Sequence, residues 1–286
     1  TVTPISGAFA YISNYTSNNV SVINTATNTL VATIPVGITP YGVSVSPDGS
    51  RIYVANFGSG TVSVINTLTN TIVTNIAVGS GPYGVSVSPN GSRLYVTNYG
   101  ANSVSVVNTA TNTVLTTVSV GSNPRGISAS PDGKQVYVAN IGSNNVSVIN
   151  TLTNTVSATI TVGSGPLGVA VSPDGTLAYV SNQNSNNVSV ISTATNTVIA
   201  TILAGTGPYG ISVSPNGTRV FVANYLSNNV TVINTATNTV ITTVAVGGLP
   251  RGVSFNVDGT LAYVANYGSN NVSVIKTTTN AVVTSF

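Results

Sequence analysis

Two positions of the chain collect its tyrosines and arginines at a regular spacing. The first is the middle residue of a Pro-x-Gly triplet, and every 42 residues it is occupied by Tyr41, Tyr83, Arg125, Leu167, Tyr209 and Arg251. The second directly follows a recurring Asn, and it is occupied by Tyr15, Phe57, Tyr99, Ile141, Gln183, Tyr225 and Tyr267. Aromatic rings can stack on a sugar or a protein loop, and a guanidinium can hold an acidic group.

The elements that position these residues follow from the same 42-residue repeat. In the second copy, residues 42–46, 51–56, 61–65 and 71–78 are short β-branched stretches separated by turn signals such as Asp48-Gly49. Seven copies follow one another without insertions, and no stretch has helical periodicity. The sequence therefore predicts an all-β fold, a seven-bladed β-propeller with four antiparallel strands per blade.

The register of the repeat predicts the domain organisation. The whole chain, residues 1–286, forms a single propeller, in which blade 1 covers about residues 1–34 and blade 7 about residues 253–286. Thr1 aligns with the start of a first strand and Phe286 with a fourth strand. We therefore expect no strand exchange between the first and last blades, so that packing between blades alone closes the ring.

The predicted topology brings the two variable positions together. In a propeller the links between blades and the loops between second and third strands lie on one face. We therefore predict a ligand-binding face made of Tyr41, Tyr83, Arg125, Tyr209, Arg251, Tyr99, Tyr225 and Tyr267. The alternative is that these rings cover hydrophobic rims between blades, because they recur at the repeat period as structural residues do.

The composition excludes several kinds of site. Without His or Cys there is no usual zinc site, no imidazole or thiolate haem ligand, no disulfide and no Ser-His-Asp triad. The only acids are four Asp in one repeated turn, where Asn90 and Asn216 replace them in other copies. This interchange indicates a turn residue, since the alternative of calcium sites requires six to eight oxygen ligands. We predict no metal, no cofactor and no catalytic residue.

Charge and hydropathy limit the partners. The formal net charge of +3 is a difference between seven cations and four anions, which does not indicate binding to nucleic acid. No segment reaches the roughly 18 apolar residues that a membrane helix needs, so no membrane insertion is expected.

Two further features bear on the surface. Asn-x-Ser/Thr sequons share one repeat position before the third strand, and they give the glycosylation candidates Asn19, Asn145, Asn187, Asn229 and Asn271. The predicted fourth strands, such as residues 71–78 and 239–246, carry no charge and no proline. Because exposed strand edges usually carry such protection, we expect neighbouring copies or glycans to cover this rim.

The segments Tyr53-Val54-Ala55-Asn56, Tyr95-Val96-Thr97-Asn98 and Tyr263-Val264-Ala265-Asn266 resemble the YVTN family of propellers. The flanking Pro-x-Gly-Val-x-Val-Ser-Pro-Asp/Asn-Gly and Asn-Asn-Val-Ser-Val-Ile-Asn-Thr patterns complete the resemblance, which covers the whole chain. It implies a seven-bladed ring on the cell surface or outside the cell, with a structural or adhesive role.

We accordingly expect a non-enzymatic, extracellular structural or adhesive module whose partners are further copies, other surface proteins or glycans. One alternative is a carbohydrate- or protein-binding receptor that uses the Tyr/Arg face. A second is an enzyme such as a lyase or lactonase, in which Tyr and Arg act as acid and electrophile. A third is a consensus-like repeat protein without an evolved ligand.

Overall fold

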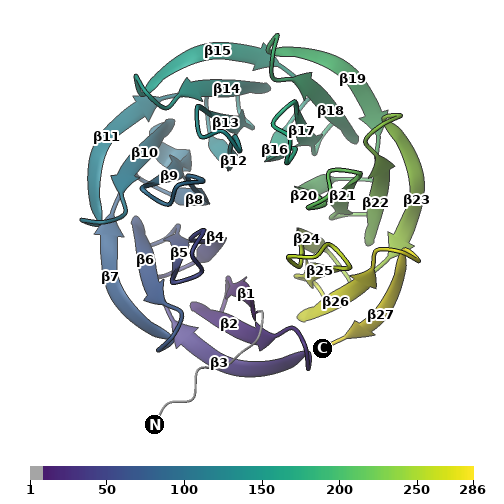
Figure 1. The fold of residues 1–286 in the computed structure, drawn as a ribbon, viewed down its shortest axis with the longest axis horizontal. Coiled ribbons are helices and arrows are strands. Elements are labelled where there is room, and N and C mark those ends of the chain that lie inside the picture. The colour runs from purple at the N-terminus through teal and green to yellow at the C-terminus, as the bar shows by residue number, and fades with distance from the viewer. Residues whose placement is uncertain (1–8) are drawn as a thin grey trace. The chain divides into compact units, whose positions relative to one another are not determined.

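The computed structural model describes residues 9–286. These residues form seven successive sheets of antiparallel strands in chain order, together with one 3-10 turn, η1 (Tyr99–Ala101). Figure 1 shows the strands of each sheet following one another along the chain. The fold is the predicted all-β, seven-bladed β-propeller.

The chain divides into two compact units, Thr1–Ile127 and Ser128–Phe286, and the boundary falls within β12. The first sheet contains β1 (Phe9–Asn14), β2 (Asn19–Asn24) and β3 (Thr29–Pro35). The second contains β4 (Pro40–Val45), β5 (Arg51–Asn56), β6 (Thr61–Asn66) and β7 (Thr71–Ala77). The third contains β8 (Pro82–Val87), β9 (Arg93–Asn98), β10 (Ser103–Asn108) and β11 (Thr113–Ser119).

The other four sheets repeat this pattern. The fourth contains β12 (Pro124–Ala129), β13 (Gln135–Asn140), β14 (Asn145–Asn150) and β15 (Thr155–Thr161). The fifth contains β16 (Pro166–Val171), β17 (Leu177–Asn182), β18 (Asn187–Ser192) and β19 (Thr197–Leu203). The sixth contains β20 (Pro208–Val213), β21 (Arg219–Asn224), β22 (Asn229–Asn234) and β23 (Thr239–Ala245). The seventh contains β24 (Pro250–Phe255), β25 (Leu261–Asn266), β26 (Asn271–Lys276) and β27 (Ala281–Ser285).

The strands lie where the repeat predicts them, although β4 (Pro40–Val45) begins two residues before the expected range of 42–46. Among residues 9–286, the four strands of the seventh sheet come from one continuous stretch of chain and none comes from the first sheet, as predicted. The first strand predicted for blade 1 lies outside the described residues.

The turn between the first and second strands is fixed by its own side chains. In the second sheet the Asp48 carboxylate accepts a hydrogen bond of 2.6 Å from the Ser46 hydroxyl and one of 3.0 Å from the Ser50 amide. Gly49 adopts a positive φ of 71°, which glycine tolerates. Asn90 makes the same contacts with Ser88 and Ser92 in the third sheet. The aspartates are therefore turn residues.

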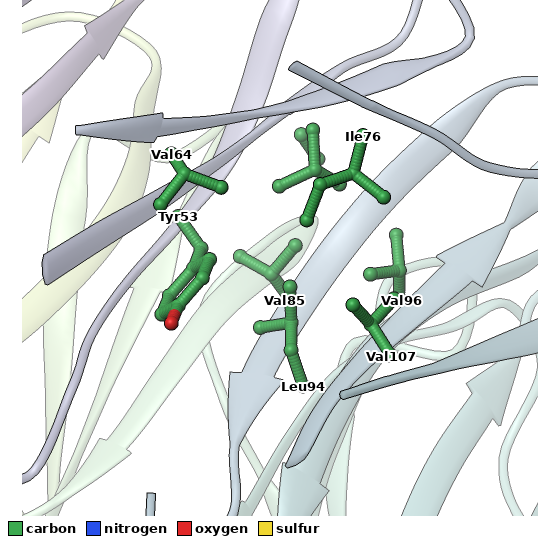
Figure 2. Packing of buried hydrophobic residues seen from close by; sticks show 9 residues of the cluster. Tyr53, Val64, Ile76, Val85, Leu94, Val96 and Val107 are labelled. Carbon is green, nitrogen blue, oxygen red and sulfur yellow. The ribbon is translucent and has the colours of Figure 1, made fainter. Parts of the chain in front are cut away.

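The hydrophobic core lies between neighbouring sheets. In the first unit Tyr53 and Val64 of the second sheet pack with Leu94 and Val107 of the third, as Figure 2 shows. Residues 52–56 of β5 are all buried, so both faces of this strand are covered and its side chains do not alternate between apolar and polar. Fully burying one such large apolar side chain stabilises the fold by about 1.5–3 kcal/mol.

The fourth strands leave apolar side chains exposed. Ile72 and Val73 of β7 and Val240 and Ile241 of β23 are among these residues. Among the described residues, no helix is long and apolar enough to cross a membrane.

Candidate functional site

Backbone hydrogen bonds join links between sheets to loops that follow a second strand. The amide of Tyr225 donates to the carbonyl oxygen of Gly207 at 2.9 Å, and the amide of Tyr267 donates to that of Leu249 at 3.1 Å. Since Tyr209 lies two residues after Gly207 and Arg251 two residues after Leu249, the two variable positions of the repeat become neighbours. The predicted proximity of link and loop residues is therefore confirmed within each unit.

Glycine in the Pro-x-Gly triplet allows the first strands of adjacent sheets to approach closely. A Cβ atom on Gly210 of β20 would lie 2.3 Å from the carbonyl oxygen of Arg251 in β24. The same relation holds between Gly84 of β8 and Arg125 of β12. The close approach places the side chains of Tyr209 and Arg251 next to one another.

Four predicted site residues of the second unit form one group, which we call the Arg251 cluster: Tyr209, Tyr225, Arg251 and Tyr267. The guanidinium carbon of Arg251 lies 5.7 Å, 5.5 Å and 3.8 Å from the ring centres of Tyr209, Tyr225 and Tyr267, respectively. The Tyr209 and Tyr225 rings are 5.9 Å apart. Tyr267 is 40% exposed and Arg251 is half-buried, so the cluster reaches the surface.

Three residues of the first unit form a second group, the Arg125 cluster: Tyr83, Tyr99 and Arg125. The guanidinium carbon of Arg125 lies 4.9 Å from the Tyr83 ring centre and 5.2 Å from that of Tyr99. Its Nη1 also donates a hydrogen bond of 3.4 Å to the Tyr83 hydroxyl. This arginine is therefore directed toward a neighbouring side chain.

Aromatic side chains extend the Arg125 cluster through the first unit. The Tyr41 and Tyr83 rings stack with centres 4.3 Å apart, and Tyr41 also contacts Tyr15 and Phe57. Leu167, at the same repeat position in the second unit, is buried and only 2% exposed. The repeat position therefore serves packing in some sheets and presents a cation in others.

The asparagine that ends the second strand holds the loop that follows it, and in the second to seventh sheets it is buried. In the sixth sheet Asn224 donates from Nδ2 to Asn229 Oδ1 at 2.7 Å and to Thr231 Oγ1 at 2.8 Å. Equivalent bonds hold Asn140, Asn182 and Asn266. These amides fix the loop that carries Tyr225 or Tyr267 to the rigid sheet.

The glycosylation candidates lie at the starts of third strands. Asn19, Asn145, Asn187, Asn229 and Asn271 are half-buried, and each accepts a hydrogen bond from the asparagine that ends the second strand of its sheet. The sequon hydroxyls of Ser147, Ser189, Thr231 and Ser273 are 2% exposed or less. A glycan at these positions would therefore have to be attached before the sheet forms.

The four carboxylates do not contribute to either cluster. Their hydrogen bonds with turn residues lower their pKa values, and bonds from Ser46 and Ser50 lower the pKa of Asp48 to about 2. The described residues contain no group of three or more possible metal-binding acids. Asp258 lies in the turn that follows the last residue of β24, whereas Arg251 is the second residue of that strand. The aspartate and the arginine are therefore at opposite ends of β24.

The sequence did not predict a depression in the second unit, which lies among the turns that follow first and third strands. It has a volume of about 680 Å³ and lies among Asp174, Asn216, Thr218, Arg219 and Asn234. Its carboxylate and amide oxygens already accept hydrogen bonds in the turns, and Arg219 Nη1 donates to Asn280 Oδ1 at 2.8 Å. These groups stabilise turns and do not converge on a ligand.

Comparison with known proteins assigns the chain to a family. A family model described as "Lactonase, 7-bladed beta-propeller" matches residues 68–156 and 150–283. The chain belongs to this seven-bladed lactonase propeller family. A search among curated proteins finds no match.

Solved structures give the same fold. The hydrazine synthase of Kuenenia stuttgartiensis is 26% identical with a TM-score of 0.87, covering 94% of this chain and 92% of that one. A protein of unknown function from Desulfotomaculum acetoxidans is 17% identical with a TM-score of 0.85, covering 98% and 95%. Dihydro-heme d1 dehydrogenase NirN is 16% identical with a TM-score of 0.73, covering 100% and 64%.

The family overturns the expected function. The prediction of a non-enzymatic structural or adhesive module is wrong, because the lactonase propellers and the hydrazine synthase are proteins of enzymatic type. The absence of His and Glu and the location of every Asp in one repeated turn had favoured a non-enzymatic role over the enzyme alternative. Arginine can polarise a carbonyl group and tyrosine can donate a proton, so the remaining residue types are compatible with catalysis.

Proposed function

We propose that this chain is a ligand-handling propeller of enzymatic type that binds a small carboxylate or its lactone at the Arg251 cluster. The observation that carries the proposal is the stacking of the Arg251 guanidinium on Tyr267 at 3.8 Å, with two further tyrosine rings within 6 Å. Membership of the lactonase family makes lactones the first substrates to test.

The stacked geometry suits recognition of a carboxyl group. A guanidinium that lies on an aromatic face uses its π surface for that contact, while its N–H donors point outward in its own plane. A carboxylate can accept two of these donors in parallel, which gives both strength and orientation. Tyr209 and Tyr225 offer apolar surface beside the same group.

The charge distribution favours an anionic ligand. The chain has seven Lys and Arg residues and four Asp, and the aspartates are confined to turns. The cluster therefore combines a cation with rings in a chain that is almost without charge. Cation–π contacts contribute about 0.5–2 kcal/mol, so the rings hold Arg251 in place before a ligand arrives.

The same geometry supports ring opening of a lactone. Hydrogen bonds from Arg251 to the lactone carbonyl oxygen would stabilise the negative charge that develops there when water adds to the carbonyl carbon. The bond between this carbon and the ring oxygen then breaks, the ring oxygen takes one proton of the added water, the other proton goes to the solvent, and the product is a hydroxy carboxylate. Arg251 would hold the carboxylate group of that product.

Calorimetric titration with a lactone and its hydroxy acid tests the binding step, and acid release followed in a pH-stat tests turnover. We expect the hydroxy acid to bind and Arg251→Leu to abolish the binding. Leucine is the natural residue at this repeat position in the fifth sheet, so the variant should fold. Arg93→Leu is the charge-matched control, because Leu177 and Leu261 occupy its repeat position.

Equal binding by the wild-type protein and Arg251→Leu would refute the assignment of the site. Loss of binding in Arg93→Leu would show that net charge, and not the cluster, attracts the ligand. Binding without turnover would leave a ligand-binding propeller and remove the proposed hydrolysis.

Within the propeller family we propose that the chain belongs to the YVTN-repeat type. The Tyr-Val-x-Asn segments of β9, β13 and β25 support this narrower assignment. The type implies a location outside the cell or on its surface. Fractionation of the source cells with an antibody to this chain would test the location, and recovery in the cytoplasmic fraction would contradict it.

A further inference from the structure

The surroundings of the Arg251 cluster differ from the repeat at two positions. Leu249, in the link before Arg251, stands where the other links have Thr39, Gly81, Asn123, Gly165 and Gly207. Leu226, directly after Tyr225, stands where most other loops have glycine, as at Gly58, Gly100 and Gly268. Two large apolar residues therefore occur together at the sheet pair that forms the Arg251 cluster.

Leu249 is held in an unfavourable backbone conformation. Its φ is 52°, in the left-handed region that suits glycine and asparagine but disfavours leucine. The other links fill this position mainly with residues that tolerate it, so local folding does not call for a leucine here. Residues held in such conformations are concentrated at functional sites.

Hydrogen bonds connect Leu249 to both loops of the cluster. Its amide donates to Asn228 Oδ1 at 2.8 Å, in the loop that carries Tyr225 and Leu226. Its carbonyl oxygen accepts from the amide of Tyr267 at 3.1 Å. A Cβ atom at position 268 would lie 2.9 Å from Leu249 Cγ, so Gly268 leaves room for the leucine side chain beside Tyr267.

Leu226 adds a second apolar group to this surface. Its side chain is 59% exposed, and its Cγ lies 3.1 Å from the position that a Cβ atom would take on Gly207. Gly207 is in turn bonded to Tyr225, whose ring faces the Arg251 guanidinium at 5.5 Å. The cation, the rings and the two leucines are thus carried by the same two links and two loops.

We propose that the Arg251 cluster takes an amphipathic carboxylate, with its acid group on Arg251 and an alkyl chain along Leu226 and Leu249. This proposal rests on the function proposed above and specifies its ligand class. Each methylene that Leu226 and Leu249 bury removes apolar surface from water, so a longer chain binds more tightly. Full burial of one methylene corresponds to about a fourfold gain in affinity.

Titration calorimetry with butyrate, hexanoate, octanoate and decanoate tests the proposal. We expect the affinity of the wild-type protein to rise with chain length. The double variant Leu226→Gly, Leu249→Gly should lose the dependence of affinity on chain length. Glycine is the natural residue at both repeat positions, so the variant should fold, which its thermal transition by circular dichroism will verify.

The outcomes separate this inference from the proposed function. If Arg251→Leu abolishes binding while the double variant keeps the full chain-length dependence, the alkyl site is refuted and the acid site stands. If affinity does not change with chain length in the wild type, the alkyl site is likewise refuted. If no carboxylate of the series binds, both proposals fail.

Discussion

The guanidinium carbon of Arg251 lies 3.8 Å from the centre of the Tyr267 ring, whereas that of Arg125 lies 5.2 Å from the Tyr99 ring. The two arginines are three copies apart, but the two tyrosines are not equivalent: in the copy of Arg125 the repeat position of Tyr267 is occupied by Ile141, and Tyr99 corresponds to Tyr225, whose ring centre lies 5.5 Å from the guanidinium carbon of Arg251. Arg251 therefore stacks on a tyrosine that has no counterpart in the copy of Arg125, whereas Arg125 donates a hydrogen bond of 3.4 Å to the Tyr83 hydroxyl. The two clusters are unequal versions of one arrangement.

This difference predicts that replacing each arginine by lysine will weaken carboxylate binding to different extents. Lysine keeps the charge but loses the planar fork and the stacking, so Arg251→Lys should weaken carboxylate binding about tenfold, equivalent to about 1.4 kcal/mol. Arg125→Lys should change the same affinity less than twofold. Calorimetric titration with octanoate measures both. A larger loss in Arg125→Lys would assign the ligand to the first unit.

A second prediction concerns two buried tyrosines at one repeat position. The Tyr137 hydroxyl donates to Gln135 Oε1 at 2.7 Å, whereas the described residues offer no hydrogen-bond partner to the buried hydroxyl of Tyr179, two residues after Leu177. Tyr137→Phe should lower the free energy of unfolding by about 0.5–1.5 kcal/mol, and Tyr179→Phe should leave it unchanged or raise it. Urea denaturation measures both variants.

The hydroxyl of Tyr179 offers a complementary control. Leu177→Gln supplies the side chain that serves Tyr137 and should make Tyr179→Phe destabilising in the double variant. If Tyr179→Phe alone costs as much as Tyr137→Phe, the difference between Gln135 and Leu177 does not govern these hydroxyls.

The repeat made most of the fold predictable, because each 42-residue copy contains its own turn chemistry and buried residues. Asp48-Gly49 closes a hairpin whose partners Ser46 and Ser50 are local, so sequence alone identifies it. The proximity of Tyr225, Arg251 and Tyr267 also followed from strand order. The distances between the guanidinium and the tyrosine rings did not follow from strand order, because these distances depend on the path of the link and on side-chain rotamers.

Other features of the site were visible in the sequence but were not used. Leu226 and Leu249 stand out only when each copy is compared with the others position by position. The structure adds that Leu249 has a left-handed backbone conformation, in which leucine is unusual. The enzymatic type of the family was only an alternative at the level of the sequence, because a chain without His or Glu offers only Tyr and Arg as acid and electrophile and their packing is not visible in the sequence.

A third prediction concerns acid stability. The pKa of Asp48 is about 2 in the folded protein, below its ordinary value of 3.8, because Ser46 and Ser50 donate hydrogen bonds to its carboxylate. A depressed folded pKa stabilises the fold above the unfolded pKa, and this stabilisation is lost as the pH falls through 3.8 toward 2. We expect the thermal midpoint to fall over this range.

The four aspartates permit a matched control for the acid effect. Asn90 and Asn216 accept the same hydrogen bonds without titrating, so replacing Asp48, Asp132, Asp174 and Asp258 by Asn should preserve the fold at pH 7. The quadruple variant should show a smaller loss of thermal midpoint between pH 4 and pH 2 than the wild type. An equal loss in both proteins would place the acid sensitivity elsewhere.

A fourth prediction concerns Thr39, a β-branched residue with a φ of 59°. Thr39→Asn should raise the free energy of unfolding by about 1 kcal/mol, because asparagine tolerates the left-handed region and Asn123 adopts it in another link with a φ of 53°. Thr39→Val keeps the branching and should bring no gain. Guanidinium denaturation compares the three proteins, and a gain from valine would show that strain at this residue is not the cause.

A fifth prediction concerns the hydroxyl that joins two first strands at the Arg125 cluster. Thr97 Oγ1 donates to the carbonyl oxygen of Arg125 at 2.7 Å and accepts from the Gly84 amide at 2.8 Å. Thr97→Val leaves both backbone groups without this partner and should lower the free energy of unfolding by about 1–3 kcal/mol. Thr97→Ser should cost much less, because Ser181 makes the same two bonds to Gly168 and Tyr209 in the fifth sheet. Urea denaturation provides the comparison, and equal losses in the two variants would assign the effect to packing of the threonine methyl group instead of the hydroxyl.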